Sequence, residues 1–221
     1  MAADIKNIPI SAAFLGTVGL KEDIKSGFVA TGFDSISSMQ QRAIFAAMDG
    51  FDVIVFSTFG SNENAILSLC ALQQIDSSLK EVQILVLAPT HETGREIRIY
   101  VNGVGRFMKI NCQVFTSDTE IKSDIKYIKS GCQFVIGTPA RIARLFYEGY
   151  LCLENLKLFS MCDYDPNISL SYAKVISQIG RDVRRVYFIE DISIVPSKYF
   201  FDSMKVVLEQ NSNDLTFLQY T

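Results

Sequence analysis

The sequence predicts an α/β fold in which a doubly wound parallel sheet carries helices on both of its faces. Six short runs rich in Val, Ile, Leu and Phe alternate along the chain with longer helical patterns. Runs of that length and composition are typical of central strands that are buried on both faces. Strand–helix–strand alternation implies right-handed crossover connections, which place the strands parallel to one another.

The expected elements follow in order along the chain. A helix over residues 20–31 is closed by Gly32 and belongs to an N-terminal flank, residues 1–31. Strands are expected over residues 52–56, 82–87, 112–115, 133–136, 158–161 and 186–189, and Pro89 follows the second of them. Helices are expected over residues 63–74, 90–108, 119–129, 139–148 and 169–179. No linker-like stretch divides residues 32–221, which we interpret as one domain.

Composition and charge exclude several classes of protein. Hydrophobic residues make up 48% and charged residues 20% of the chain, as in soluble globular domains. The net charge of −3 and the pI of about 5.3 argue against a dominant, non-specific nucleic-acid binder. Local basic faces remain, one with Arg95, Arg98 and Arg106 and another with Arg181, Arg184 and Arg185.

Targeting signals and cysteine spacing indicate the cellular compartment of the protein. No apolar run reaches the roughly 18 residues that a membrane-spanning helix needs, and the start of the chain does not resemble a secretory signal. The five cysteines form no C-x-x-C pair, so neither a zinc site nor a disulfide framework is indicated. We expect a cytoplasmic or nuclear protein, neither secreted nor membrane-bound, with Cys70 and Cys162 as buried thiols.

Functional residues of a doubly wound sheet are expected in the loops that follow the carboxyl ends of its strands. Three segments in or near those loops carry a family resemblance. GFDSISSMQQRAI (residues 32–44) resembles the Q motif of DEAD-box RNA helicases, VLAPTHE (86–92) their L-A-P-T-R-E-L, and VIGTPAR (135–141) their V-x-G-T-P-G-R. The chain is most similar to the branch that contains eukaryotic initiation factor four-A. The resemblance runs from about residue 14 to the C-terminus.

The resemblance implies a RecA-like fold, the first of the two RecA-like domains of these helicases. It makes Gln40 the adenine-reading glutamine, or a residue that now only holds the flank to the domain. It also places Thr90, His91, Glu92, Thr138 and Arg141 on the surface that follows an RNA backbone. His91 replaces an arginine and is the only histidine, and without nucleophilic partners it is weak evidence for catalysis.

The phosphate loop departs from the family pattern A-x-x-G-x-G-K-[ST]. Residues 57–64 read STFGSNEN, so Gly60 is retained, Glu63 stands at the lysine position and Asn64 at the hydroxyl position. A working loop needs the lysine to neutralise the phosphates and the hydroxyl to hold Mg²⁺. Like charges at ~4 Å repel by about 4 kcal/mol at an effective dielectric near 20. We therefore expect weak or absent triphosphate binding, and a polar turn in which Asn62 or Asn64 caps a helix.

The D-E-A-D motif is also altered, since Cys162-Asp163-Tyr164-Asp165 stands in its place. Cysteine prefers softer metals than Mg²⁺, and Asp163 is one methylene shorter than the glutamate that positions water. If the alignment is shifted by one residue, Asp163 takes the position of the first aspartate, but Tyr164 then takes the position of the glutamate. Either alignment loses an essential group.

Two further motifs of the family are absent. Glu190-Asp191-Ile192 replaces S-A-T, and Ser117-Asp118 replaces a double glycine that lets the backbone approach RNA. The segment 206–209, followed by 215–217, resembles the linker between the two RecA-like domains.

Three functional hypotheses follow from these departures. The first is a catalytically inactive domain that acts as a protein-interaction adaptor in RNA metabolism or translation, without a cofactor or metal. Its partner would be a helical scaffold of the kind that binds initiation factor four-A-like helicases, docked on helices near residues 42–48, 95–106 and 141–144. The second is an RNA-binding module without ATP control, which is expected to bind weakly. The third is a nucleotide-binding protein in which Glu63, Asp163 and Asp165 gather a cation.

Overall fold

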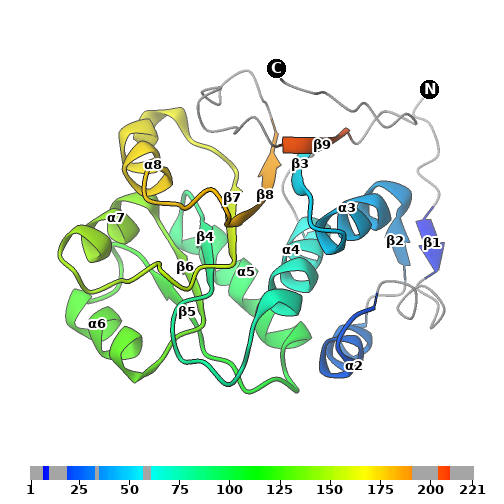
Figure 1. Cartoon of the computed structure of the whole chain (residues 1–221), viewed down its shortest axis with the longest axis horizontal. Helices are drawn as coiled ribbons and strands as arrows, with labels where there is room; N and C mark the ends of the chain where they lie inside the picture. The colour runs from blue at the N-terminus through cyan, green and yellow to red at the C-terminus, as the bar shows by residue number, and fades with distance from the viewer. Residues whose placement is uncertain (1–6, 10–18, 33–34, 57–60, 191–203, 210–221) are drawn as a thin grey trace.

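The computed structural model describes residues 7–9, 19–32, 35–56, 61–190 and 204–209. Its main sheet has seven parallel strands in the order β5-β6-β4-β7-β8-β3-β9 (Figure 1). These strands are β3 (Asp52–Phe56), β4 (Ile84–Leu87), β5 (Cys112–Phe115), β6 (Phe134–Gly137), β7 (Leu158–Cys162), β8 (Arg184–Ile189) and β9 (Met204–Glu209). A doubly wound parallel sheet was predicted and is confirmed.

Helices connect the strands. They are α2 (Glu22–Ala30), α3 (Ser38–Met48), α4 (Ser61–Gln74), α5 (His91–Val104), α6 (Ile121–Ser130), α7 (Pro139–Tyr147) and α8 (Ser169–Ile176), with a 3₁₀ turn at Pro166–Ile168. Among the described helices, none is both long and apolar enough to cross a membrane.

Two hydrophobic cores lie on the two faces of the sheet, because successive strand residues point to opposite faces. Val53 and Val55 of β3 belong to the first core, which lies beneath α2, α3, α4 and α5. Ile54 belongs to the second core, which lies beneath α7 and α8. Figure 1 shows these two groups of helices on opposite sides of the sheet.

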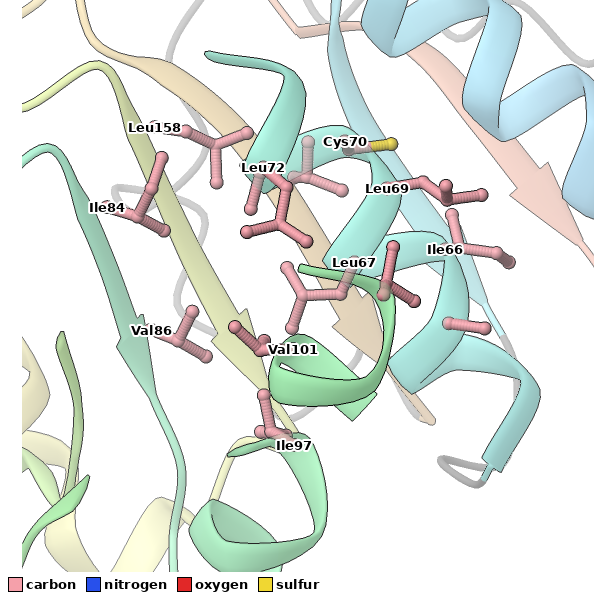
Figure 2. Packing of buried hydrophobic residues seen from close by; sticks show 14 of the residues in the cluster. Ile66, Leu67, Leu69, Cys70, Leu72, Ile84, Val86, Ile97, Val101 and Leu158 are labelled. Atoms are coloured by element: carbon pink, nitrogen blue, oxygen red, sulfur yellow. The ribbon is translucent and has the colours of Figure 1, made fainter. Parts of the chain in front are cut away.

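The first core is densest where α4 and α5 meet the central strands. Figure 2 shows Leu67 and Leu72 of α4 beside Ile84 of β4 and Leu158 of β7, with Val101 of α5 close by. All five side chains are fully buried. Burial of each such side chain stabilises the fold by roughly 1.5–3 kcal/mol, so this face anchors the middle and the C-terminal half of α4.

The expected flank helix packs into this same core. Ile24 and Phe28 of α2 are fully buried. The backbone of α2 approaches α5 so closely that a Cβ built on Gly27 would collide with the carbonyl oxygen of Val104. Only glycine permits that crossing.

Several element bounds differ from those predicted. β4 begins at Ile84 rather than residue 82, because the amides of Gln83 and Ile84 both donate to the carbonyl of Gln133 and interrupt the ladder. α5 ends at Val104, where Gly105 forms the C-cap, instead of continuing to residue 108.

Three strands were not predicted as strands. β1 (Asn7–Pro9) pairs with β2 (Ser35–Ser37) in a separate antiparallel sheet. Residues 206–209, which resemble a linker, form most of β9, which pairs with β3 at the edge of the main sheet. Residues 215–217 lie outside the described residues.

Candidate functional site

The altered ATPase motifs converge at the carboxyl edge of three adjacent strands. Cys162 ends β7, Glu190 follows β8, and α4 starts shortly after β3, the next strand over. Cys162 pairs with Phe188 across the β7–β8 ladder, so the two strands end level. The sheet therefore gathers these motifs in one place, as predicted for a doubly wound fold.

The first turn of α4 buries two polar side chains. Glu63 is 5% and Asn64 1% exposed. In the described part of the chain, neither Oδ1 nor Nδ2 of Asn64 has a hydrogen-bond partner. Because α4 already begins at Ser61, Asn62 and Asn64 lie inside the helix, and the prediction that one of them caps it is wrong. Gly60 lies outside the described residues.

Cys162 is an uncharged group at the position where the family has its metal-binding aspartate. The side chain is fully buried, and burial raises the pKa of its thiol to about 12. The Ser160 hydroxyl lies 3.8 Å from the Cys162 sulfur and donates to the carbonyl of Val186. At neutral pH the thiol is therefore protonated and bears no charge.

Asp163 is held in an unusual backbone conformation beside other acids. Its φ is +56°, in the left-handed region that Asp tolerates better than most residues. Its amide donates to the carbonyl of Phe188. Partial burial raises the pKa of the Asp163 carboxyl, and the nearby carboxylates of Glu190 and Asp165 raise it further.

Asp165 and Tyr164 have local structural roles. One carboxylate oxygen of Asp165 accepts hydrogen bonds from the backbone and side-chain nitrogens of Asn167, at 2.8 and 2.9 Å. Tyr164 is buried against Tyr172, with ring centroids 4.8 Å apart. Whether Tyr164 stands at the alanine or, with the alignment shifted by one residue, at the glutamate of D-E-A-D, its ring belongs to the core beneath α7 and α8.

The remaining nucleotide-motif residues are only partly described. Gln40 is the third residue of α3 and its side chain is buried. Asp191 and Ile192 lie outside the described residues. Among the residues that the structure describes, no three His, Cys, Asp or Glu side chains form a group that could hold a metal ion, so Glu63, Asp163 and Asp165 do not gather into one.

A second set of predicted residues follows β4 and β5 at the same edge. Thr90 is exposed and caps α5, accepting a hydrogen bond from the amide of Thr93. His91 Nδ1 lies 2.8 Å from the hydroxyl of Thr116 and 4.0 Å from the carboxylate of Asp118. Asp118 is exposed and adds a negative charge to the surface that the family resemblance predicts to face RNA.

The predicted RNA-facing Arg141 lies in an internal ion pair. Its Nη1 is 3.1 Å from the carboxylate of Asp124 on α6, and both side chains are buried. Its Nη2 donates to the carbonyl of Thr119 at 2.7 Å. Thr138 is half-buried at the N-cap of α7, and its amide donates to the carbonyl of Phe115.

Asp124 was not singled out from the sequence, although a signal exists. In α6 the residues Ile121, Ile125 and Ile128 form the apolar stripe, and Asp124 stands within it. A carboxylate on an apolar helix face indicates a buried cation partner.

Comparison with known proteins agrees with this architecture. The family model described as DEAD/DEAH box helicase matches residues 37–189. The "ATP-dependent RNA helicase eIF4A" of Pyricularia oryzae is 30% identical over 202 residues, which cover 88% of this chain and 51% of that protein. The protein of the same name from Neurospora crassa is 35% identical over 162 residues, covering 73% of this chain and 41% of that protein.

Solved structures show the same fold. Saccharomyces cerevisiae Dbp5 bound to RNA and ADP BeF3 superposes with a TM-score of 0.76 at 22% identity, covering 88% of this chain and 51% of that one. A DEAD box protein from Methanococcus jannaschii gives a TM-score of 0.73 at 19% identity, over 86% of this chain and 53% of that one.

Fold and site together define a RecA-like α/β domain of the helicase type. The chain belongs to the DEAD/DEAH box helicase family. It spans about half the length of the curated relatives it matches.

Proposed function

We propose that this chain is a catalytically inactive DEAD-box domain that serves as a protein-interaction adaptor in RNA metabolism or translation, in the cytoplasm or nucleus.

The observation that carries the proposal is the buried carboxyl side chain of Glu63 in the first turn of α4. The positive end of a helix attracts anions, and phosphate-binding loops use this end together with a lysine. Here an acid of the chain itself occupies the first turn at 5% exposure. Glu63 therefore competes with a phosphate for the helix end and repels it as well.

Among the described residues, the carboxyl ends of the neighbouring strands β7 and β8 offer no compensating positive charge. The residues there are the neutral thiol of Cys162 and the acids Asp163 and Glu190. Mg²⁺ prefers oxygen ligands, and a protonated thiol is a poor substitute for a carboxylate. The residues at this edge do not fit a magnesium–triphosphate complex.

An adaptor role is supported by exposed apolar side chains on the helices where docking is expected. Ile99 on α5 is 67% exposed and Phe45 on α3 is 36% exposed. One structural neighbour, S. cerevisiae Dbp5, has been solved with two protein partners, Nup159 and Gle1. A helical scaffold of the kind that binds initiation factor four-A-like helicases is the partner class that we propose.

The test is a calorimetric titration of such a purified scaffold into the chain, with and without ATP·Mg²⁺. We expect the same dissociation constant in both conditions. Ile99→Asp should weaken binding by about tenfold, or ~1.4 kcal/mol. Ser177→Asp, an exposed position beside α8 on the other face of the sheet, is the matched control. Binding that requires ATP, or no binding at all, would contradict the adaptor proposal.

RNA binding without ATP control is the second candidate, and exposed Thr90 beside half-buried Thr138 favours it. The exposed carboxylate of Asp118 disfavours it. Fluorescence anisotropy with a single-stranded RNA at two salt concentrations separates the two. Tight, strongly salt-dependent binding would favour the RNA module over the adaptor.

A further inference from the structure

A pocket of about 280 Å³ lies at the edge of the sheet opposite the nucleotide motifs. Its lining includes Lys80, Val82, Ile128, Lys129, Tyr150 and Cys152. Val82 precedes β4, and α6, which contributes Ile128 and Lys129, leads into β6. Thr90 and Thr138 follow the same two strands at their other ends. A ligand of this pocket would therefore leave the RNA-facing loops free.

Hydrogen bonds hold the wall of the pocket in place. The side chain of Gln133 is buried. Its Oε1 accepts a hydrogen bond from the backbone nitrogen of Asn111 at 2.9 Å, and its Nε2 donates one to the carbonyl of Leu79 at 2.8 Å. The amide of Cys132 donates to the carbonyl of Lys80 at 3.1 Å. These bonds tie the segment before β4 to the segment before β6, so the pocket is preformed and binding requires little ordering.

Lys80 and Lys129 place two positive charges at the pocket. The carbon chain of Lys80 packs over Gly131, where a built Cβ would lie 3.0 Å from the Lys80 Cβ. Glu81 also lines the pocket, and its carboxylate accepts from the Lys80 amide. Within the described residues, neither Lys80 nor Lys129 lies within ion-pair distance of a carboxylate.

Two further lysines extend the positive charge along α6. Lys122, Lys126 and Lys129 are exposed and spaced by four and three residues, so they share one side of the helix. The stripe is about 10 Å long at 1.5 Å per residue. No carboxylate of the described chain forms an ion pair with these three side chains. The chain as a whole is acidic, which makes this stripe a local feature.

The size and lining of the pocket select one kind of occupant. Its volume falls just below the roughly 300–1,000 Å³ that small-molecule sites enclose, so it suits one or two side chains. Val82 and Ile128 supply an aliphatic lining, and the lysines supply charges that complement carboxylates. We propose that this pocket and the α6 lysines bind an acidic segment of a partner protein, which inserts one aliphatic or aromatic side chain.

This inference rests on the proposed adaptor function and names a second surface for it. The first surface, around Ile99, belongs to the helices on the opposite face of the sheet from α7 and α8. A partner segment bound at the pocket and a scaffold bound at α5 would be held by the same domain at once.

The experiment uses a short synthetic peptide in which a leucine is flanked by glutamates and aspartates. Its binding to the full chain is followed by the rate at which Cys152, the exposed cysteine, reacts with an alkylating reagent. The other four cysteines are buried. We expect saturating peptide to slow alkylation of Cys152 at least about fivefold, and prior alkylation to abolish peptide binding.

Charge-reversal variants test the lysines. The double variant Lys126→Glu/Lys129→Glu should lower the affinity for the acidic peptide by about tenfold or more. Lys174→Glu/Arg181→Glu makes the same change in net charge at exposed positions elsewhere and should leave binding unchanged. Peptides in which the acids become amides, or the leucine becomes serine, should bind at least about tenfold more weakly.

Three results would overturn the inference: no protection of Cys152 by the acidic peptide, equal loss of binding in both double variants, or better protection by a single-stranded RNA than by the peptide. The peptide assay involves neither nucleotide nor scaffold. A chain that binds the scaffold but not the peptide therefore refutes only this inference. A chain that binds the peptide but not the scaffold contradicts the scaffold-binding adaptor and leaves the pocket's ligand as inferred.

Discussion

The guanidinium of Arg141 lies 3.1 Å from the carboxylate of Asp124, and both side chains are buried. Arg141 comes from the segment that resembles T-P-G-R, which in the family follows RNA. In this chain it joins the first turn of α7 to α6 and also donates to the carbonyl of Thr119. The burial of Asp124 raises the pKa of its carboxyl, and the hydrogen bond from Thr119 and the charge of Arg141 act against that rise.

Arg141→Ala should destabilise the fold substantially. The substitution leaves Asp124 buried without its cation, and loss of one partner of a buried pair costs roughly 3–5 kcal/mol. The control is Arg144→Ala on the same helix, which removes an exposed pair with Glu148 worth less than about 1 kcal/mol. Urea unfolding measures both. Equal losses would show that the buried pair does not anchor α7.

Asp163→Asn should stabilise the protein at neutral pH. The raised pKa of Asp163 means that the folded state disfavours its carboxylate, and asparagine keeps the left-handed backbone while removing the charge. The gain should stay below about 1 kcal/mol because solvent screens a partly exposed group.

The same shift fixes the pH dependence of that gain. The pKa of an aspartate in the unfolded chain is near 3.8, and the pKa of Asp163 in the folded state is higher. The contribution of Asp163 to the stability of the wild type is therefore highest below pH 3.8 and falls as the pH rises through the folded-state pKa. Unfolding of wild type and Asp163→Asn should therefore diverge as the pH increases from 4 to 7. A constant difference across this range would refute the raised pKa.

Gly27→Ala should loosen α2 from the domain. Alanine normally favours a helix by about 0.5–1 kcal/mol over glycine, but here its methyl group would meet the carbonyl oxygen of Val104. We expect a net loss of about 2 kcal/mol or more and faster proteolysis near α2. Ser26→Ala, the exposed neighbour, should stay within about 0.5 kcal/mol of wild type. A stabilised Gly27→Ala would mean that α2 does not cross α5 so closely.

Thiol reactivity should separate one cysteine from four. Cys152 is exposed, whereas burial raises the pKa of Cys70, Cys132 and Cys162 to about 12 and that of Cys112 well above its usual value. Because the thiolate is the reactive species, only Cys152 should be alkylated in the folded protein at neutral pH. Mass spectrometry should find one modification before unfolding and five after it. Early modification of Cys162 would contradict its burial beneath the altered motif.

Hydrophobic runs were enough to predict the fold class and the bounds of β3 and β5, because each of these strands is a short run of apolar residues with one polar residue. The burial of Cys70 and Cys162 among apolar neighbours was predicted and is confirmed. Short edge elements were harder. β1 and β2 have three residues each, and β9 acquires its identity only by pairing with β3.

The details of the site depend on contacts between residues distant in sequence. The motif alignment located Glu63 and Asn64, but their burial depends on where α4 begins, which a loop sequence does not specify. The pairing of Arg141 with Asp124 joins two helices across 17 residues. The contact between the tilted rings of Tyr164 and Tyr172 likewise requires the fold of the loop between β7 and α8.

The central claim is that the altered phosphate loop does not bind a nucleoside triphosphate, and thermal unfolding with ATP·Mg²⁺ or ADP tests it most directly. A ligand at ~100 times its dissociation constant stabilises a protein by ~2.7 kcal/mol, which is several degrees in melting temperature. The corresponding half of the Neurospora crassa relative is the positive control, and Glu63→Lys shows whether restoring the cation restores binding. The account predicts no rise for the wild-type chain at millimolar nucleotide. A rise of several degrees in the wild type would contradict it.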